Sequence, residues 1–192
     1  NIYAKSICKE RVKMLKQCFD NVREKHPLVH NITNYVTVND VANILLACGG
    51  SPIMADDSGE VEDITSICQG LNINIGTLNK NTIPSMFLAG KKANVLGHVV
   101  LLDPVGAGAS GLRTKTANEL VRDIKFTVIR GNISEIRTLM EGTGNTKGVD
   151  ADLADAVTEE NLDETIGKLK AFSEATGSVI ACVLYTSPSP RD

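Results

Sequence analysis

Short apolar runs alternate with longer segments along most of this chain. Five runs have the length of buried strands: LVHNI, SPIMA, LNINIG, HVVLLD and FTVIRG, at 28–32, 51–55, 71–76, 98–103 and 126–131. In the longer segments apolar residues recur every three or four positions, which favours helices. These helices are expected over 37–48, 58–69, 81–94 and 114–124, and from about 133. The alternation is typical of βαβ units and predicts an α/β fold, with a mostly parallel central sheet and helices on both faces.

Local signals indicate where two of these helices begin and end. The first has five apolar residues on one face, and Gly49 and Gly50 should end it, because glycine commonly follows a helix. The five residues are Val38, Val41, Ala42, Leu45 and Leu46. In SGEVEDITSICQG we expect Ser58 to cap the helix, acidic residues to occupy its first turn, and Gly70 to stop it.

Polar residues follow the predicted strands. Because crossovers between parallel strands are right-handed, the carboxyl ends of the strands share one edge of the sheet, and open α/β sheets bind ligands at that edge. The residues expected there are His30, Asn31, Asn34, Met54, Asp56, Asp57, Gly76, Thr77, Asp103, Arg130, Gly131, Asn132 and Glu135. Any one of them could be an ordinary polar loop residue, but together they indicate a binding site.

Asp103 and Glu135 are the candidate metal ligands. Two carboxylates at the ends of neighbouring strands repel each other unless a cation or shared water lies between them. Mg²⁺ is bound in this way, through one or two carboxylates together with waters and substrate phosphates. Arg130 adds a planar donor suited to phosphate oxygens. The alternative for Arg130 is an ion pair with one of the two carboxylates.

The stretch VVLLDPVGAGASG, residues 99–111, passes from a strand into a run of very small residues. Gly106, Gly108 and Gly111 would let a phosphate approach the backbone, and the amides that open the next helix favour negative charge. The stretch is not a Walker loop, because no Gly-Lys-Ser/Thr follows it. Its glycines follow the fourth strand, whereas a dinucleotide-binding GxGxxG follows the first. A simple tight turn is the alternative.

Composition narrows the class of protein. With 192 residues, 42% of them apolar and 22% charged, the chain has the size and balance of one globular domain. The net charge of −3 argues against nucleic acid as a partner. Neither a membrane span nor a signal peptide is recognisable, so a cytoplasmic location is expected. The five cysteines form no CxxC pair, and we expect reduced thiols rather than a metal cluster or disulfides.

Several of these stretches, in this order, resemble the hydroxyethylthiazole kinase family. They are PLVHNITNYVTVNDVANILLACGGSPIMADDSGEV, LNINIGTLN, VLLDPVGAGASGLRT and VIRGNISEI, and the resemblance covers roughly residues 8–181. It implies a ribokinase-like α/β fold, assembled as a homotrimer with active sites between subunits. It also implies transfer of the γ-phosphoryl group of ATP to the hydroxyl of 4-methyl-5-(2-hydroxyethyl)thiazole in thiamine biosynthesis, with Mg²⁺.

The resemblance also implies roles for individual residues at the matching positions. Contacts with the thiazole substrate are implied for Asn34, Met54 and Gly76. Contacts with the nucleotide are implied for Arg130 and Asn132, and a place in the metal and phosphate region for Asp103 and Glu135. A polarizable thioether such as that of Met54 suits an aromatic sulfur heterocycle, although a methionine more often simply fills a core.

The end of the sequence departs from the family. After GSVIA the resemblance would lead to a Val-Thr-Gly turn and later a Gly-Thr-Gly-Cys segment, neither of which is found, so we name no catalytic residue. Cys182 is not the family's cysteine. CVLYTSPSPRD, residues 182–192, resembles a translated sequencing adapter instead. We expect a partial kinase domain over 1–181, incomplete at the C-terminus, followed by a non-native tail, and we expect this chain alone to be inactive. The first residue, Asn1, indicates a missing beginning as well.

Two alternatives remain at this stage. One is another ribokinase-like kinase for a small molecule such as a pyrimidine or pyridoxal, although HNITNYVT argues against it. The other belongs to a different class: a non-catalytic nucleotide-binding module, which would respond to ATP and not to the thiazole.

Overall fold

The strands of the predicted sheet are all present. The computed structural model describes residues 2–142, 157 and 160–183, and within these residues six strands form one parallel sheet. The strands are β1 (Leu28–Ile32), β2 (Ser51–Met54), β3 (Gly70–Asn74), β4 (Val99–Asp103), β5 (Val128–Asn132) and β6 (Val179–Val183). The helices are α1 (Ile2–Lys25), α2 (Val38–Cys48), α3 (Val61–Ile67), α4 (Thr82–Leu96), α5 (Gly111–Asp123), α6 (Ile133–Gly142) and α7 (Leu162–Thr176).

The strand order is β2-β1-β3-β4-β5-β6, and every neighbouring pair is parallel. The predicted α/β class is therefore confirmed. The chain moves outward from β1 to β2 and then crosses back to β3 on the other side of β1. Such a reversal opens a crevice at the carboxyl ends of the two strands between which it occurs, here β1 and β3.

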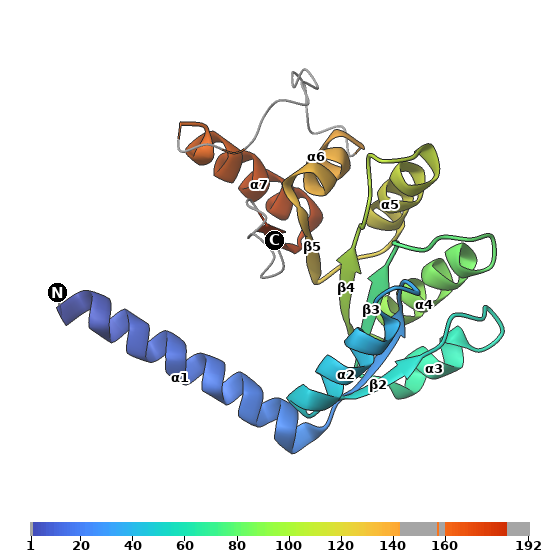
Figure 1. Cartoon of the computed structure of the whole chain (residues 1–192), viewed down its shortest axis with the longest axis horizontal. Helices are drawn as coiled ribbons and strands as arrows, with labels where there is room; N and C mark the ends of the chain where they lie inside the picture. Colours follow the sequence, from blue (N-terminus) through green and yellow to red (C-terminus); the bar gives the residue numbers. More distant parts are fainter. Residues whose placement is uncertain (1, 143–156, 158–159, 184–192) are drawn as a thin grey trace.

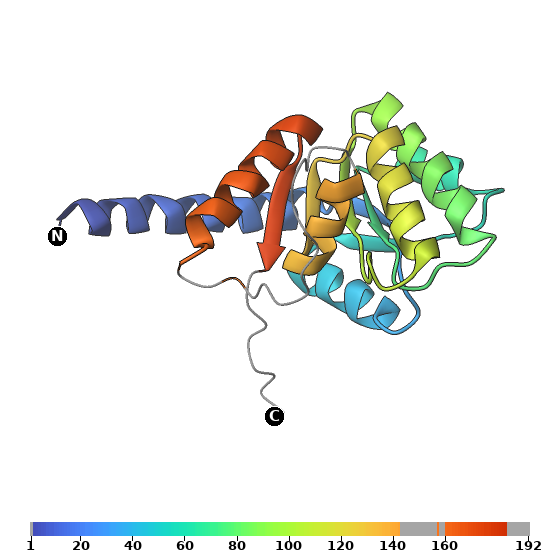
Figure 2. The same ribbon diagram turned by 90° about the horizontal axis from the view of Figure 1, so that it is seen from above.

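Both faces of the sheet carry helices, but unequally. Right-handed crossovers place α2 on the face opposite the helices that follow β2, and Figures 1 and 2 show α2 apart from the row formed by α3, α4, α5 and α6. Beneath that row lies the core, in which every second strand residue is buried: Leu71, Ile73, Val100, Leu102 and Ile129. On the α2 side, Val99 and Val179 are more than half exposed.

Helix α1 projects away from the sheet as a separate arm (Figures 1 and 2). Along its described side chains, Val12, Leu15 and Phe19 are exposed apolar residues. Helix α2 has no buried residue, and Leu46 lies on its exposed surface although the sequence predicts it on an apolar face. Within the described residues, no helix combines the length and the apolar character needed to cross a membrane.

The predicted ends of the second helix are wrong. Helix α3 begins at Val61 with Glu60 as its N-cap, because the Asp57 carboxylate accepts the Gly59 amide and the Asp57 carbonyl accepts the amides of Glu60 and Val61. Ser58 lies inside this turn, which runs from Asp57 to Val61, and therefore does not cap the helix. Gly70 does not stop the helix either. It is the first residue of β3, where it pairs with Val29 of β1 and with Val99 of β4.

Three elements were not predicted: α1, α7 and β6. Strand β6 pairs with β5 along its whole length, from Val128 opposite Val179 to Asn132 opposite Val183. The predicted boundary between residues 181 and 182 therefore falls inside a strand, and the tail's first two residues, Cys182 and Val183, belong to the sheet. The remainder of that predicted tail, 184–192, lies outside the described residues.

Phe172 tests whether α7 is part of the core. Its side chain is 1% exposed and packs in the main apolar cluster. We expect Phe172→Ala to lower the free energy of unfolding by about 3–5 kcal/mol, because it removes buried area and leaves a cavity. Urea unfolding of the 192-residue chain gives the value. Leu112→Ala, at an exposed position of α5, should change it by less than about 0.5 kcal/mol. Equal effects of the two variants would place α7 outside the cooperative core.

Candidate active site

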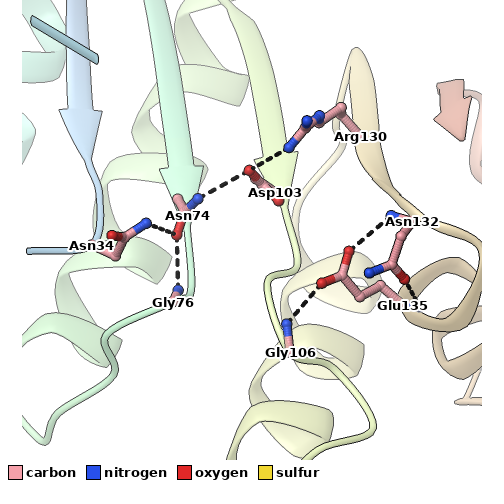
Figure 3. A network of polar contacts seen from close by, with 8 residues as sticks. All are labelled: Asn34, Asn74, Gly76, Asp103, Gly106, Arg130, Asn132 and Glu135. Carbon is pink, nitrogen blue, oxygen red and sulfur yellow. Dashed lines mark hydrogen bonds and ion pairs between the residues drawn. The ribbon is translucent and has the colours of Figure 1, made fainter. Parts of the chain in front are cut away.

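The polar residues predicted at the carboxyl edge do converge, and they lie next to the crevice between β1 and β3. Figure 3 shows a continuous chain of side chains that runs from Asn34, after β1, through Asn74 at the end of β3, to Asp103 at the end of β4 and Arg130 on β5. This row of side chains crosses four neighbouring strands, β1, β3, β4 and β5.

The end of this row at Asn34 is built around two amide side chains. Asn34 Nδ2 donates to Asn74 Oδ1 at 3.0 Å, and Asn34 Oδ1 accepts the amides of Val36 and Thr37 at 3.0 Å each. Asn74 Oδ1 also accepts the Gly76 amide at 2.8 Å. A Cβ added to Gly76 would lie 2.9 Å from that same oxygen and 3.0 Å from Asn34 Cβ, so only glycine fits there.

Asp103 occupies the centre of the site. Its Oδ2 accepts from Asn74 Nδ2 at 3.0 Å and from Arg130 Nη1 at 3.2 Å. Its Oδ1 is buried and has no hydrogen-bond partner among the described residues. Burial raises the pKa of this carboxyl group above its ordinary value and outweighs the opposing effect of the Arg130 charge. The ion pair foreseen as the alternative for Arg130 is thus present, with Asp103 as its partner.

Asp103 Oδ1 is suited to binding a cation or a metal-bound water. A buried carboxylate oxygen without a donor is costly, and a cation or its bound water would satisfy it. The described residues contain no group of three or more histidine, cysteine, aspartate and glutamate side chains placed to hold a metal. One or two carboxylates, completed by waters and substrate phosphates, are nevertheless how Mg²⁺ is usually held. The site therefore fits a cation that arrives with an anionic ligand.

Glu135 has a different set of contacts. Its amide donates to Asn132 Oδ1 and its Oε2 accepts the Asn132 amide, both at 2.9 Å, which is the reciprocal pattern of a capping box at the start of α6. Its Oε1 accepts the Gly106 amide at 2.9 Å. Glu135 thus ties the turn after β4 to the turn after β5. No described contact joins it to Asp103, so the two carboxylates are not a bonded pair.

The glycine-rich turn satisfies most of its own amides. Those of Ala107 and Ala109 donate to the carbonyls of Pro104 and Gly106 at 2.9 Å, and that of Gly108 donates to Thr114 Oγ1 at 2.9 Å. With Gly106 bound to Glu135, four successive amides are engaged inside the chain. This part of the stretch is therefore a tight turn, the alternative interpretation, and not an open cradle for a phosphate.

Arg113 holds two loops of the site together, a role that the sequence pattern did not reveal. From the first turn of α5 its Nη2 donates to the Gly76 carbonyl at 2.7 Å, and its Nη1 approaches the Val105 carbonyl at 3.5 Å. The guanidinium lies directly over Gly106, where an added Cβ would overlap it. Gly106 also has a φ of +73°, which disfavours any side chain.

The His30 side chain is fully buried and is not exposed at the candidate site. Its Nε2 contacts the Ala55 carbonyl at 2.8 Å and its Nδ1 contacts Thr65 Oγ1 at 2.9 Å. Since a carbonyl only accepts, Nε2 donates to Ala55, while the Thr65 hydroxyl that contacts Nδ1 donates to the Val61 carbonyl at 2.7 Å. Burial lowers the pKa of His30 and outweighs the opposing effects of the Ala55 hydrogen bond and of Glu60. His30 is a structural tie between β1, the end of β2 and α3.

Met54, the third residue predicted to contact the substrate, lies at the edge of the sheet. It ends the edge strand β2, where it is 37% exposed, and β1 and β3 separate it from Asp103 on β4. Three strand intervals correspond to roughly 14 Å across the sheet. Asn34 and Gly76 are brought together through Asn74, and Met54 lies opposite Asn31 on the neighbouring strand β1.

Comparisons with known proteins agree on one family. The family model described as "Hydroxyethylthiazole kinase family" matches residues 19–183. The hydroxyethylthiazole kinase of Clostridium acetobutylicum is 68% identical over 168 residues, which cover 88% of this chain and 62% of that protein. That of Clostridium tetani is 57% identical over 159 residues, which cover 83% and 57%.

A solved structure gives the same result at the level of the fold. The hydroxyethylthiazole kinase protein from Pyrococcus horikoshii OT3 superposes with a TM-score of 0.77 at 34% sequence identity, over 89% of this chain and 61% of that one. The chain thus spans about three-fifths of the length of the relatives that it matches.

Gly106 and Gly111 form a matched pair for testing the turn. We expect Gly106→Ala to lower the free energy of unfolding by about 2 kcal/mol or more, because a left-handed φ is costly for alanine and the new Cβ displaces Arg113. At Gly111 an added Cβ meets open space, and Gly111→Ala should change the value by less than about 0.5 kcal/mol. Chemical unfolding of both variants is the measurement, and similar losses would contradict the described turn.

His30 should make stability depend on pH. The unfolded histidine takes up a proton near its ordinary pKa of about 6.5, whereas the folded ring does so only at lower pH. The free energy of unfolding contributed by His30 is therefore present above pH 6.5 and is lost as the pH falls below it. Between pH 7.5 and 5.5 the free energy of unfolding should fall more for the unchanged chain than for the His30→Gln variant. Parallel pH slopes for the chain and for His30→Gln would refute this.

Proposed function

The chain belongs to the hydroxyethylthiazole kinase family, and from that membership we propose that the complete protein transfers the γ-phosphoryl group of ATP to the hydroxyl of 4-methyl-5-(2-hydroxyethyl)thiazole, a step of thiamine biosynthesis. The observation that carries the proposal is the line of side chains from Asn34 to Arg130 at the crevice beside β1 and β3. One end of this line offers amides and a glycine surface for a small neutral ring. The other end offers a carboxylate and a guanidinium for a phosphate and its cation.

Each end has a separate task in this proposal. Asn34 and Gly76 border the thiazole, and the fixed amide contacts between them keep that wall rigid. Arg130, 55% exposed at its side chain, donates to phosphate oxygens, and Asn132 follows it at the end of β5 on the nucleotide side. In phosphoryl transfer the protein mainly positions the reactants and stabilises charge on the transferred group.

A divalent cation, which we propose to be Mg²⁺, would bind through Asp103 Oδ1 and would neutralise charge on the phosphates. The support is that Oδ1 is buried and lacks a donor among the described residues. Glu135 contributes to the same region. Each of its carboxylate oxygens accepts one amide and retains a second acceptor position, which suits a metal-bound water. Glu135 also holds Gly106 and Asn132 in place around that region.

We further propose a homotrimer in which Met54 contacts the thiazole bound to a neighbouring subunit. Met54 is exposed on the edge strand and lies three strand intervals from Asp103 of its own chain. Apolar side chains are exposed on nearby segments as well: Tyr35, Val36, Ile44 and Leu46. A surface of this kind suits contact with another copy of the protein.

The proposed activity is tested with a chimera that replaces the matching 168-residue stretch of the Clostridium acetobutylicum relative with the residues of this chain. A coupled ADP-release assay should show turnover that depends on the thiazole alcohol, on ATP and on a divalent cation. Pyridoxal and a hydroxymethylpyrimidine serve as competing substrates. Preference for either of them, or ATP binding without any turnover, would overturn the proposal. The 192-residue chain, assayed in parallel, tests the expectation that it is inactive alone.

Substitutions of Asp103 and Met54 should change different kinetic constants of the chimera. Asp103→Asn should lower kcat by about 100-fold with little change in the KM for the thiazole alcohol, because it weakens the hold on the cation. Met54→Ala should raise that KM about tenfold and leave kcat nearly unchanged, because it removes about 1–2 kcal/mol of apolar contact. Steady-state kinetics at saturating ATP separates the two effects.

Mixing the two variants tests the trimer. If Met54 serves a neighbouring subunit, mixed trimers contain some sites with both native residues, and activity at low thiazole concentration should exceed that of either variant alone. If both residues act within one subunit, every site keeps one defect and no activity is regained. The second result would refute the shared site, and sedimentation analysis reports the oligomeric state independently.

A further inference from the structure

We propose that Asn74 is the positioning residue that sets the two ends of the site relative to each other. It holds the substrate-side loop through its oxygen and the Asp103 carboxylate through its nitrogen. The sequence analysis assigned it no role, although it lies inside LNINIGTLN, because it reads as one polar residue of an ordinary strand. The inference rests on the proposed phosphoryl transfer for its kinetic consequences, but its geometric part stands without it.

The orientation of the Asn74 amide is fixed by its partners. Oδ1 receives two donors, Asn34 Nδ2 at 3.0 Å and the Gly76 amide at 2.8 Å, while Nδ2 faces a carboxylate oxygen at 3.0 Å. The reversed amide would place two donors against an N–H₂ group and its own oxygen against Asp103. Because all three contacts would then be lost, only one orientation is compatible with this environment.

Asn74 determines which oxygen of Asp103 is presented to a ligand. Asn74 and Arg130 both bind Oδ2, which leaves Oδ1 as the oxygen without a donor. The two anchors differ in exposure. Asn74 is 7% exposed and lies directly opposite Asp103 in the sheet, whereas the Arg130 side chain is 55% exposed. Asn74 is therefore the anchor that remains in place when Arg130 turns toward a phosphate.

The same amide positions the wall for the substrate. Gly76 follows β3 after a single residue, and its amide is held by Asn74 while its carbonyl accepts from Arg113 at 2.7 Å. The loop after β3 is therefore fixed at both polar groups of one glycine. Loss of the Asn74 oxygen would release the Gly76 amide and Asn34 Nδ2 together, and the alcohol of the substrate would lose its alignment with the carboxylate.

Two substitutions separate the two functions of Asn74. Asn74→Asp keeps an acceptor for Gly76 and Asn34 but replaces the donor to Asp103 with a second carboxylate. Asn74→Ala removes both functions. Asn72→Ala is the matched control, because Asn72 lies on the same strand and face but donates to Asn31, and no described hydrogen bond joins its side chain to Gly76 or Asp103. Assays at pH 8 and above favour ionisation of the new carboxyl group, whose pKa is raised by burial and by the neighbouring Asp103 carboxylate.

In the chimera we expect Asn74→Asp to lower kcat at least about tenfold with the KM for the thiazole alcohol within twofold of the unchanged protein. Asn74→Ala should lower kcat similarly and also raise that KM severalfold, and Asn72→Ala should change neither. A merely structural residue would not produce this split. Equal KM changes in the Asp and Ala variants, or an Ala variant within twofold of the unchanged protein in both constants, would overturn the inference.

A second measurement on the 192-residue chain is independent of the proposed activity. Hydrogen exchange of the Gly76 amide, followed by NMR, should stay slow in Asn74→Asp and become at least about tenfold faster in Asn74→Ala, with circular dichroism as the check that both are folded. If the chimera lacks thiazole kinase activity but exchange follows this pattern, the proposed function fails and the positioning role stands. If exchange is the same in both variants, the positioning role fails.

Discussion

The pairing of Asn74 with Asp103 in neighbouring strands is the constraint on which the candidate site depends. Because β3 and β4 end together, their last side chains leave the same face of the sheet within hydrogen-bond distance. A slip of one residue would turn Asp103 toward the buried face, where an ionised carboxylate would lack partners. Ile73 and Leu102, buried on that face, hold the register. The apolar packing of one face thus places the polar chemistry on the other.

Much of this arrangement could be predicted from the sequence. Five of the six described strands follow from short apolar runs, and parallel topology alone requires their carboxyl ends to meet. Asn34, Gly76, Asp103 and Arg130 were expected at one edge for that reason, and they lie there. Their roles toward a substrate remain proposals, but their convergence follows from chain connectivity, which a single sequence records well.

Other features depend on partners that are distant in the sequence, and no local pattern reveals these. Arg113 reads as an ordinary residue of a polar helix until its guanidinium is seen to reach Gly76, 37 positions away. The amides of the glycine-rich turn are spent on Glu135 and on the turn itself, whereas small residues alone predict an open cradle. Helix α7 and strand β6 lie beyond the segments in which strand and helix signals alternated clearly.

The two outer strands of the sheet differ in how they resist self-association. Strand β2 has four residues and includes Pro52, which has no N–H to offer to another chain. In the described part of the chain the opposite outer strand is β6, five residues long, with the sequence VIACV and no charge or proline. Its outward backbone N–H and C=O groups could pair with those of β6 in a second copy, and because each copy brings one such edge, the pairing would end at a dimer. The short β2 edge, interrupted by Pro52, resists the second contact that growth into longer assemblies would need.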